Sequence, residues 1–381
     1  MGAPQQTESL DAARAPDPKV GSKPGTGSRW GPTLRMAGVA LLSLSLLAGC
    51  TAANGASEES SGAKVELLRT DSPLRTPTWV PKEGVLLALS QDGKELVRLD
   101  PGAGTPPGEE PGSLAVVSSK SLGDAGESMA PNPRKLEDIH VPQPALDRVT
   151  LVDADTLRTK GHLEAGEAPE WAAVHPGSKS LFALSDDGST VTGVSLEKGK
   201  RTFSVRVEGG KDAILEVPEK GIEPAFYIVD PGGVEFYSGH PPERQVGKRI
   251  GVEEEAFTLD DDAAERFYVG EPSGEVDLIE GDPQDELKGR LLVEKKLDLG
   301  EPAEYLQSRI AEELLVYAAT ESKVVAIKYD TMQILGSVDF RRYLKQRSLE
   351  DAKVSGMSVG EKRVYLTLEG EPYVLSVEKP S

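Results

Sequence analysis

Short apolar segments separated by turn residues recur along this chain at a nearly constant interval, and this repeat limits the possible folds most strongly. Segments such as Leu314–Tyr317 and Arg363–Leu366 are bounded by Gly, Pro or Asp, which is typical of short β-strands. One unit opens with Gly166–Glu170 and another with the closely similar Gly300–Glu304. Alignment on the last residue of these openings gives equivalent positions spaced 42 to 49 residues apart: Thr78, Glu127, Glu170, Ala213, Glu255, Glu304 and Lys353.

A period in this range, with three or four strands in each unit, is typical of β-propeller blades. The unit that opens at Lys353 has room for only three strands before Ser381, and the apolar segment Lys64–Arg69 can supply the fourth. Such pairing joins the two ends of the chain in one blade and removes a free sheet edge. We therefore predict an all-β fold for residues 63–381, a seven-bladed β-propeller of four-stranded antiparallel blades whose last blade is closed by the N-terminal strand.

One stretch carries a more detailed pattern. Residues 162–200 contain a Gly-x-x-Pro opening, the turn Pro176-Gly177, the apolar strand Leu181–Leu184, a Gly-x-x-Val strand and the closing turn Gly199-Lys200. In these features the stretch resembles the YVTN family of β-propeller repeats. The resemblance covers about two blades. It implies a propeller of the kind found in surface-layer and exported proteins and, more loosely, beside lactonases and dehydrogenase subunits, so it carries information on fold and little on function.

Two segments depart from the repeat. The first is a Pro/Gly-rich insert at about residues 102–112. The second, at about 340–351, places Phe340, Tyr343 and Leu344 at i, i+3 and i+4, which predicts a short amphipathic helix. Its other side carries the cations Arg341, Arg342, Lys345 and Arg347. Two interpretations stay open, a solvated helix that covers a blade joint and a docking site for an acidic partner or anionic lipid.

The N-terminal region has the organisation of an export signal. Arg29 and Arg35 precede an apolar run at 36–49, which is too short to cross a bilayer as a helix. The run ends in Leu-Ala-Gly before Cys50, the only cysteine of the chain, and this ending resembles the lipobox of bacterial lipoprotein precursors. The resemblance implies cleavage after residue 49 and a diacylglycerol on Cys50.

Residues 50–62 are rich in Gly, Ser and Ala and predict a flexible tether behind the lipidated cysteine. We therefore expect a lipoprotein held on the extracytoplasmic face of the cell membrane by a palmitate-type lipid anchor.

Charge narrows the range of partners. The chain has 63 acidic and 43 basic residues, a formal net charge of −20. Such a surface repels phosphate backbones, which argues against nucleic acid as a partner, and it tolerates a basic protein face, a cation or a cationic polymer better. Aromatic residues make up only 5% of the chain, which argues mildly against a cell-wall polysaccharide, because sugar rings stack on exposed aromatic side chains.

The repeat register provides a candidate site. If the openings mark the start of the innermost strand of each blade, then Glu127, Glu170, Glu255 and Glu304 surround one mouth of the central channel. Carboxylates that converge there suit Ca²⁺ or Mg²⁺, and like charges at close range raise a pKa and create a general acid. The third interpretation is a hydrated acidic channel without a ligand. The metal at this mouth is thus left unassigned.

Other polar clusters predict less. Asp260–Asp262 lacks the spacing of a calcium loop and is interpreted as a solvated turn, and Asp186–Gly188 as a hairpin turn. The four histidines lack zinc-site spacing, and the exported part has no nucleophile elbow, P-loop or dinucleotide motif. We assign no catalytic residue and no cofactor, apart from the possible Ca²⁺ or Mg²⁺.

These patterns together predict a membrane-anchored propeller that works as a non-enzymatic binding or scaffolding module, with another envelope protein as its partner. The alternative is a hydrolase or lactonase-like enzyme, or a divalent-cation-binding protein, that uses the channel-mouth glutamates.

Overall fold

The computed structural model describes residues 65–381, except 107, 111–112, 178, 219, 222, 245–255, 262, 264–265 and 281–291. The signal sequence, Cys50 and the tether, together with Glu255, lie outside the described residues.

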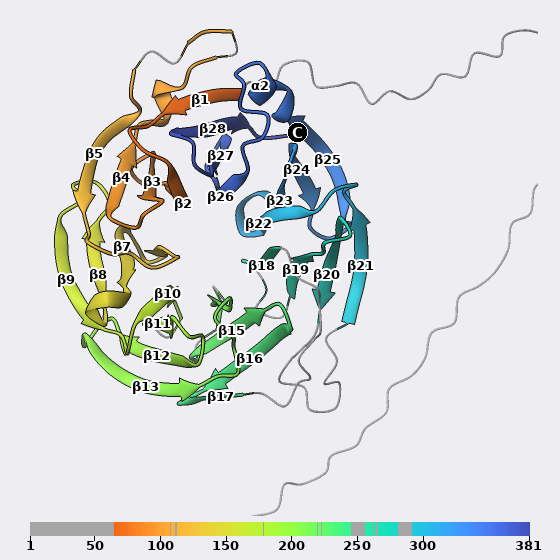
Figure 1. Cartoon of the computed structure of the whole chain (residues 1–381). Coiled ribbons are helices and arrows are strands. Elements are labelled where there is room, and N and C mark those ends of the chain that lie inside the picture. The colour runs from red at the N-terminus through yellow and green to blue at the C-terminus, as the bar shows by residue number, and fades with distance from the viewer. Residues whose placement is uncertain are drawn as a thin grey trace, which may run out of the picture. The chain divides into compact units, whose positions relative to one another are not determined.

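The described strands form seven four-stranded antiparallel sheets arranged as blades around a ring (Figure 1). Blades 1 to 3 are β2(Leu74–Val80), β3(Val85–Ser90), β4(Glu95–Leu99), β5(Val116–Ser121); β6(Ala130–Asn132), β7(Lys135–Gln143), β8(Arg148–Asp153), β9(Thr159–Glu164); and β10(Pro169–His175), β11(Ser180–Ser185), β12(Thr190–Ser195), β13(Lys200–Arg206). Blades 4 and 5 are β14(Ile214–Glu216), β15(Ala225–Asp230), β16(Gly233–Gly239), β17(Pro242–Arg244); and β18(Ala256–Leu259), β19(Arg266–Gly270), β20(Glu275–Glu280), β21(Leu292–Asp298). Blades 6 and 7 are β22(Ala303–Arg309), β23(Leu315–Thr320), β24(Lys323–Lys328), β25(Gln333–Asp339); and β26(Val354–Val359), β27(Arg363–Leu368), β28(Tyr373–Glu378), β1(Val65–Arg69). Short helices η1(Pro101–Ala103), η2(Pro144–Leu146), α1(Ile310–Glu313) and α2(Arg341–Lys345) lie in the connections.

The position of each strand in its blade follows from its apolar pattern. The second strands are almost continuously apolar, as in β3, where all six residues are buried. Both faces of such a strand pack against neighbouring blades, which favours apolar side chains there. The outermost strands alternate instead, as in β5, where every second residue is exposed. Alternation is the pattern of a strand with one wet face.

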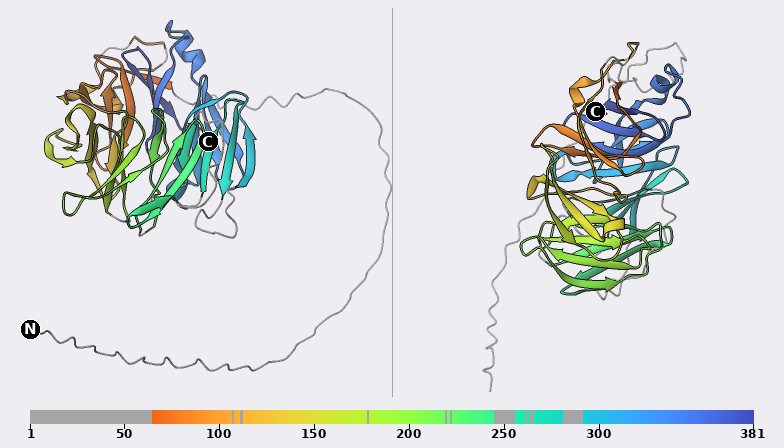
Figure 2. Two further views of the ribbon diagram at one scale, coloured as in Figure 1. Left: turned by 60° about the horizontal axis from the view of Figure 1, so that its bottom comes forward. Right: turned by 60° about the vertical axis from the view of Figure 1, so that its left-hand side comes forward.

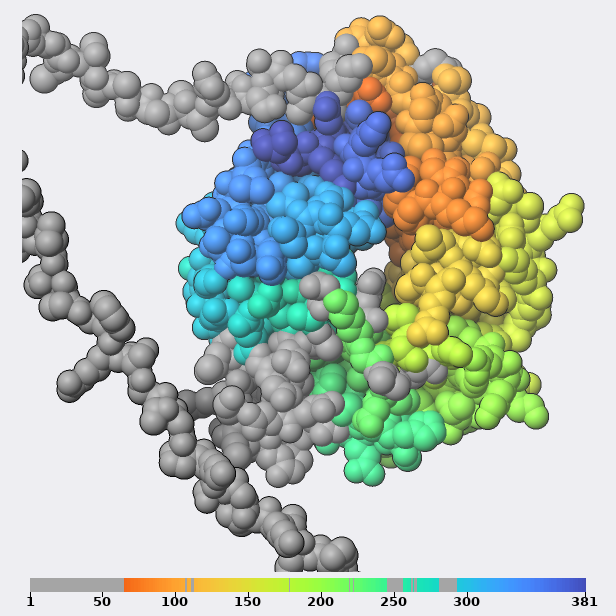
Figure 3. Space-filling model, turned by 180° about the vertical axis from the view of Figure 1, so that it is seen from behind, coloured from red at the N-terminus to blue at the C-terminus, as the bar shows by residue number. Residues whose placement is uncertain are grey.

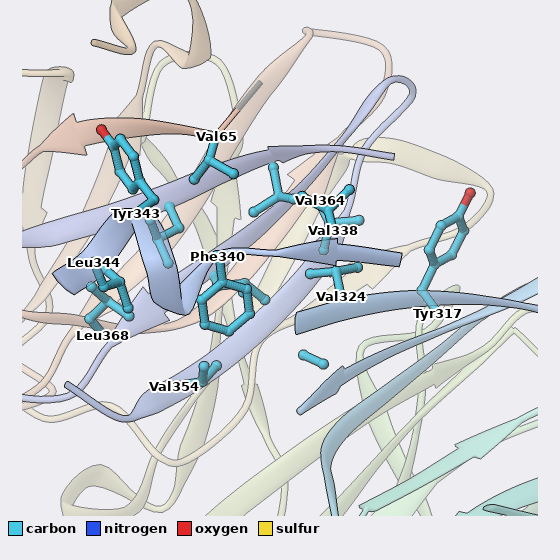
Figure 4. Packing of buried hydrophobic residues seen from close by; sticks show 14 of the residues in the cluster. Val65, Tyr317, Val324, Val338, Phe340, Tyr343, Leu344, Val354, Val364 and Leu368 are labelled. Atoms are coloured by element: carbon cyan, nitrogen blue, oxygen red, sulfur yellow. The ribbon is translucent and has the colours of Figure 1, made fainter. Parts of the chain in front are cut away.

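The core is divided among the joints between blades. The buried apolar side chains of the described residues fall into seven clusters, and each cluster joins two neighbouring blades. Figure 4 shows the cluster between blades 6 and 7, where Val324 and Val338 meet Val364 and Phe340. Since every blade contributes to two joints, the ring is held together by side-by-side packing around its full circumference.

The seventh blade is closed by the N-terminal strand, as the sequence predicts. β1 pairs antiparallel with β28 from Val65 opposite Val377 to Arg69 opposite Tyr373. Leu67 and Leu68 are fully buried on opposite faces of β1, Leu67 in the cluster between blades 6 and 7 and Leu68 in the one between blades 7 and 1. The predicted seven-bladed propeller of four-stranded antiparallel blades is confirmed.

The predicted helix at 340–351 forms, but it is shorter than predicted: α2 ends at Lys345. Ser348 adopts a left-handed φ of 56°, and the Leu349 N–H donates to the Leu344 carbonyl at 3.0 Å, which interrupts the helical hydrogen-bond pattern. The apolar face of α2 packs Tyr343 and Leu344 into the joint between blades 6 and 7 (Figure 4). Figure 2 shows α2, in blue, projecting from the ring.

The insert and α2 lie against each other although the sequence gives no sign of it. The Tyr343 hydroxyl donates to the Thr105 carbonyl at 3.3 Å. The Arg347 guanidinium donates to the carbonyls of Pro106 and Glu109 and covers the Tyr343 ring, 5.3 Å from its centroid. Thr105 also exchanges two backbone hydrogen bonds of 3.1 Å with Leu67 of β1. The insert therefore covers the outer edge of the strand that closes the ring.

Candidate functional site: the channel mouth

In each blade the innermost strand begins at the same end of the ring, which we call the mouth face; the opposite end is the far face. Because the strands of a blade alternate in direction, the second strand ends and the third begins at the mouth face too. Figure 3 shows the opening along the ring axis. A cavity of about 510 Å³ lies at the mouth face. Its described walls are Arg75, Thr76, Pro77, Glu127, Trp171, Asp212, Ile214, Glu216, Val229, Asp230, Pro231, Ala256, Phe257, Glu304, Tyr305, Leu306, Ser355, Gly356 and Met357.

A β-bulge at the start of the innermost strand places several of these side chains. The pairing of β10 with β11 shifts around Glu170, and the pairing of β22 with β23 shifts around Glu304. In blade 7 the same shift falls at Ser355. A bulge leaves one residue out of the ladder and redirects its side chain, which is how equivalent positions of different blades come to surround the channel.

The glycine that opens these units has a backbone reason. Gly166 and Gly300 precede the bulges of blades 3 and 6 and adopt φ values of 98° and 78°. Residues with a Cβ atom rarely take this conformation, so glycine is favoured where the chain turns from an outer strand into the next inner one. The recurring Gly-Glu opening in the sequence therefore corresponds to this turn.

Arg75 and Glu127 form the polar corner of the cavity. The Arg75 Nη1 donates to the Glu127 Oε2 at 2.9 Å, and its Nη2 donates to the carbonyls of Ala125 and Gly126 at 3.1 Å each. The Arg75 side chain is only 12% exposed, against 55% for Glu127. Both terminal nitrogens of the only arginine in the described walls are thus occupied by protein oxygens, which leaves this guanidinium poorly suited to hold an anionic ligand.

Glu170 lies beside this corner. Its carbonyl accepts a hydrogen bond of 3.0 Å from the Glu127 N–H. Partial burial of the carboxyl group, followed by the negative charge of Glu127, raises the pKa of Glu170 to about 6, although Arg75 acts in the opposite direction. The Glu170 carboxyl group therefore takes up protons near neutral pH, unlike an ordinary glutamate.

Glu304 belongs to the opposite side of the cavity wall. It precedes Tyr305 on β22, and both line the cavity. Burial, together with the charge of Glu304, raises the pKa of Tyr305 to about 12. Of the four predicted channel-mouth glutamates, Glu127 and Glu304 line the cavity, Glu170 adjoins it, and Glu255 lies outside the described residues.

The cavity contains further acidic residues that the repeat register did not single out. Asp212 lies two residues before β14, Glu216 is the last residue of β14, and Asp230 ends β15 near the start of β14. The Asp230 carboxylate accepts the Gly232 N–H at 2.7 Å. Asp212 directly precedes the aligned position Ala213, so a one-residue tolerance in the alignment would have found it.

The described residues contain no group of three or more His, Cys, Asp or Glu side chains arranged to hold a metal ion. Ca²⁺ or Mg²⁺ at the mouth therefore stays a prediction from the sequence, without geometric support from Glu127, Glu170 and Glu304.

The four cations near α2 have different surroundings. Arg341 donates to the Glu321 carboxylate at 2.8 Å and to the Ala352 carbonyl at 3.0 Å, and Arg347 holds the insert. Arg342 and Lys345 are exposed. The arginines 341 and 347 therefore have structural partners within the chain, which favours the interpretation of α2 as the cover of a blade joint.

The acidic turn at 260–262 was predicted to be solvated, and for its two described residues this is wrong. Asp260 is buried and pairs with Arg266 at 3.5 Å. Asp261 accepts hydrogen bonds from the Ser308 hydroxyl at 2.9 Å and from the Ile310 N–H at 2.8 Å. The Asp261 contacts join blade 5 to blade 6 over sequence separations of 47 and 49 residues, which a local pattern cannot reveal.

The Asp186–Gly188 hairpin turn forms as predicted, between β11 and β12. The Asp187 carboxylate accepts from the Ser185 hydroxyl at 2.6 Å and from the Ser189 N–H at 3.0 Å. Gly188 has a φ of 67°, as such a turn requires.

Comparisons with known proteins inform the fold only. No family model matches the chain, and no curated protein matches it. The resemblance to YVTN repeats therefore stays a prediction. Among the described residues, no helix is both long enough and apolar enough to span a membrane.

Two solved structures are similar over 84% of this chain, each at 10% sequence identity. One is described as "Structure of U3-55K", with 99% of its chain covered and a TM-score of 0.57, and the other as "Crystal structure of RRP9 WD40 repeats", with 98% covered and a TM-score of 0.59. By its fold, this chain is a seven-bladed β-propeller similar to the WD40 repeat structure.

Proposed function

We propose that this protein is a lipid-anchored, extracytoplasmic propeller that binds another envelope protein through its mouth face and performs no chemistry on it. The observation that carries the binding role is the cavity of about 510 Å³ at the channel mouth, with aromatic and apolar walls and carboxylates at its rim. Concave, largely apolar sites with a few convergent polar groups are the usual form of binding sites. The rigid ring holds these walls in place.

The anchor is supported by the sequence features around Cys50. To test it, the full chain and its Cys50→Ala variant are expressed in a bacterium that processes lipoproteins and labelled with a palmitate analogue. We expect label and membrane association for the full chain and neither label nor stable membrane association for the variant. An unlabelled, freely soluble wild-type protein would contradict the anchor.

The binding role is tested by placing a photo-crosslinking amino acid at Asp212, which is exposed and lines the cavity. The matched control position is Glu361, which is exposed in the far-face turn between β26 and β27. We expect a reproducible protein adduct from position 212 and none from 361. Equal adducts from both positions, or none from either, would count against a partner at the mouth face.

The place of Glu170 beside the cavity wall, where its carbonyl accepts from the Glu127 N–H, together with its raised pKa, favours a second candidate function, a hydrolase in which this carboxyl group is the general acid. This function predicts turnover of ester or lactone substrates that is lost in Glu170→Gln, with binding at position 212 unaffected. A variant that retains full turnover would exclude Glu170 as the acid.

A further inference from the structure

We propose that the mouth cavity binds the side chain of a lysine or arginine presented by a basic segment of the partner protein. This inference rests on the proposed function and deepens it, because it gives the partner a chemistry. Three features of the described residues carry it: the charge of the cavity wall, the nature of its apolar surfaces, and the charge of the surrounding face.

The cavity wall is strongly negative. Its described residues include the carboxylates of Glu127, Asp212, Glu216, Asp230 and Glu304 against a single cation, Arg75, which is already bound to Glu127. The pKa of the adjoining Glu170 is raised first by burial and then by the negative charge of Glu127. A ligand that brings positive charge into the cavity relieves this repulsion, whereas an anionic ligand increases it.

The apolar walls suit a long cationic side chain better than a bare ion. Trp171, Phe257, Tyr305 and Met357 line the same cavity. Lysine and arginine carry an aliphatic stem that packs on apolar surface, and their charged ends interact favourably with aromatic faces. A small hydrated cation makes no use of such walls.

The turns that join the second and third strands extend the negative field beyond the cavity, whereas the α2 connection at the mouth face carries the exposed cations Arg342 and Lys345. The turns that join the second and third strands of the seven blades contain eight carboxylates and one lysine, Lys94. The acidic residues are Asp92, Asp147, Asp186, Asp187, Glu271, Glu321, Glu369 and Glu371.

The far face differs. The described turns there that join first and second strands carry five cations, Lys82, Arg134, Lys179, Lys220 and Lys362, against seven carboxylates, Glu83, Glu223, Asp260, Asp261, Glu312, Glu313 and Glu361, so their excess of negative charge is smaller. The larger excess of carboxylates in the mouth-face turns steers a basic partner toward the mouth and accelerates its association. It therefore favours an extended basic segment over a single free ion.

The test uses the full chain in detergent micelles and three acetylated nine-residue peptides in which four Lys, four Arg or four Glu residues alternate with Gly. Binding is measured by calorimetry and by the fluorescence of Trp171, which lines the cavity. We expect the Lys and Arg peptides to bind and the Glu peptide not to bind, and we expect the fluorescence change to disappear in Trp171→Phe.

Charge variants locate the site. The double variant Asp212→Asn/Glu304→Gln should weaken the binding of the basic peptides at least tenfold, roughly the effect of two lost charge contacts. The matched control, Glu83→Gln/Glu361→Gln, removes two charges from far-face turns and should change binding less than twofold. Equal thermal melting of both variants shows that the ring is intact.

Several outcomes overturn the inference: equal binding by the cavity and control variants, equal binding of the Glu peptide, or binding of spermidine or Ca²⁺ without the peptides. If the crosslinker at Asp212 still captures a protein in those cases, the proposed binding role stands and only the basic chemistry of the partner is wrong. If neither experiment yields a contact, both proposals fail.

Discussion

Two histidines lie inside the ring with almost no contact with solvent. His140 on β7 and His175 at the end of β10 are 1% and 0% exposed. The His140 ring nitrogen Nδ1 lies 3.3 Å from the Ala130 carbonyl, which gives it a partner in its neutral form. Burial lowers the pKa of both histidines from the ordinary value of 6.5 to about 4. The folded ring therefore holds two neutral imidazoles at pH values where an unfolded chain would protonate them.

This burial predicts acid sensitivity. Between about pH 6.5 and pH 4 the unfolded state binds protons that the folded state does not, so the free energy of unfolding falls as the pH falls through this window. The effect is on the order of 3 kcal/mol for each histidine. Chemical denaturation at a series of pH values should show a shallower fall for His140→Gln. The exposed His240 provides the control, and His240→Gln should follow the wild-type curve; identical slopes for all three proteins would contradict the assignment.

At the scale of elements, the contact between the insert and α2 rests on Arg347. This arginine joins Pro106, Glu109 and Tyr343, whereas Lys345 of the same segment is exposed. Replacement by alanine removes the guanidinium from two carbonyls and one ring, which should cost the local structure about 1–2 kcal/mol.

We therefore expect Arg347→Ala to increase amide hydrogen exchange at Thr105 and Leu67 roughly tenfold and to make the insert more susceptible to limited proteolysis. Lys345→Ala removes the same charge without those contacts and should leave both readouts unchanged. Equal sensitivity of the two variants would show that charge, not the contact, holds the insert.

The strands and turns also show which parts of the fold and of the site could be predicted from local sequence patterns. The strands and their order could be predicted because each strand carries its own apolar pattern. The openings at Glu170 and Glu304 could be predicted because the same β-bulge, preceded by a glycine with positive φ, occurs in both blades. Arg75 was missed because two extra residues, Thr76 and Pro77, interrupt the pairing of β2. The alignment consequently fell on Thr78, three residues beyond the cavity-lining arginine.

Contacts between segments that are far apart in the sequence have no local sequence pattern from which they could be predicted. The insert meets α2 across 238 residues, and Asp261 meets the Ser308 hydroxyl across 47. Nothing local in either segment encodes its partner, so the insert was interpreted only as a departure from the repeat and the acidic turn as solvated.

At the scale of the whole molecule, the ring depends on one short strand from the front of the chain. Leu68 of β1 is fully buried between blades 7 and 1, and Arg69 beside it is exposed. We expect Leu68→Ala to lower the free energy of unfolding by about 2–5 kcal/mol, because it leaves a cavity in the joint that closes the ring. Arg69→Ala should change it by less than about 0.5 kcal/mol. Urea denaturation of both variants measures the difference, and a loss from Leu68→Ala no larger than that from Arg69→Ala would mean that closure contributes little.

The register of β1 has a consequence for how the protein meets its surroundings. Val65 at the start of β1 is connected across the blade, through paired residues of β28 and β27, to Val359. Val359 is the last residue of the innermost strand, which ends at the far face. The chain therefore enters the ring at the far face. With the proposed lipid on Cys50, fifteen residues upstream, the attachment point lies on the side away from the cavity, at a typical reach of about 20 Å from the bilayer. An anchor of the proposed kind would join the ring at the face opposite the cavity and would leave the mouth face open to a partner.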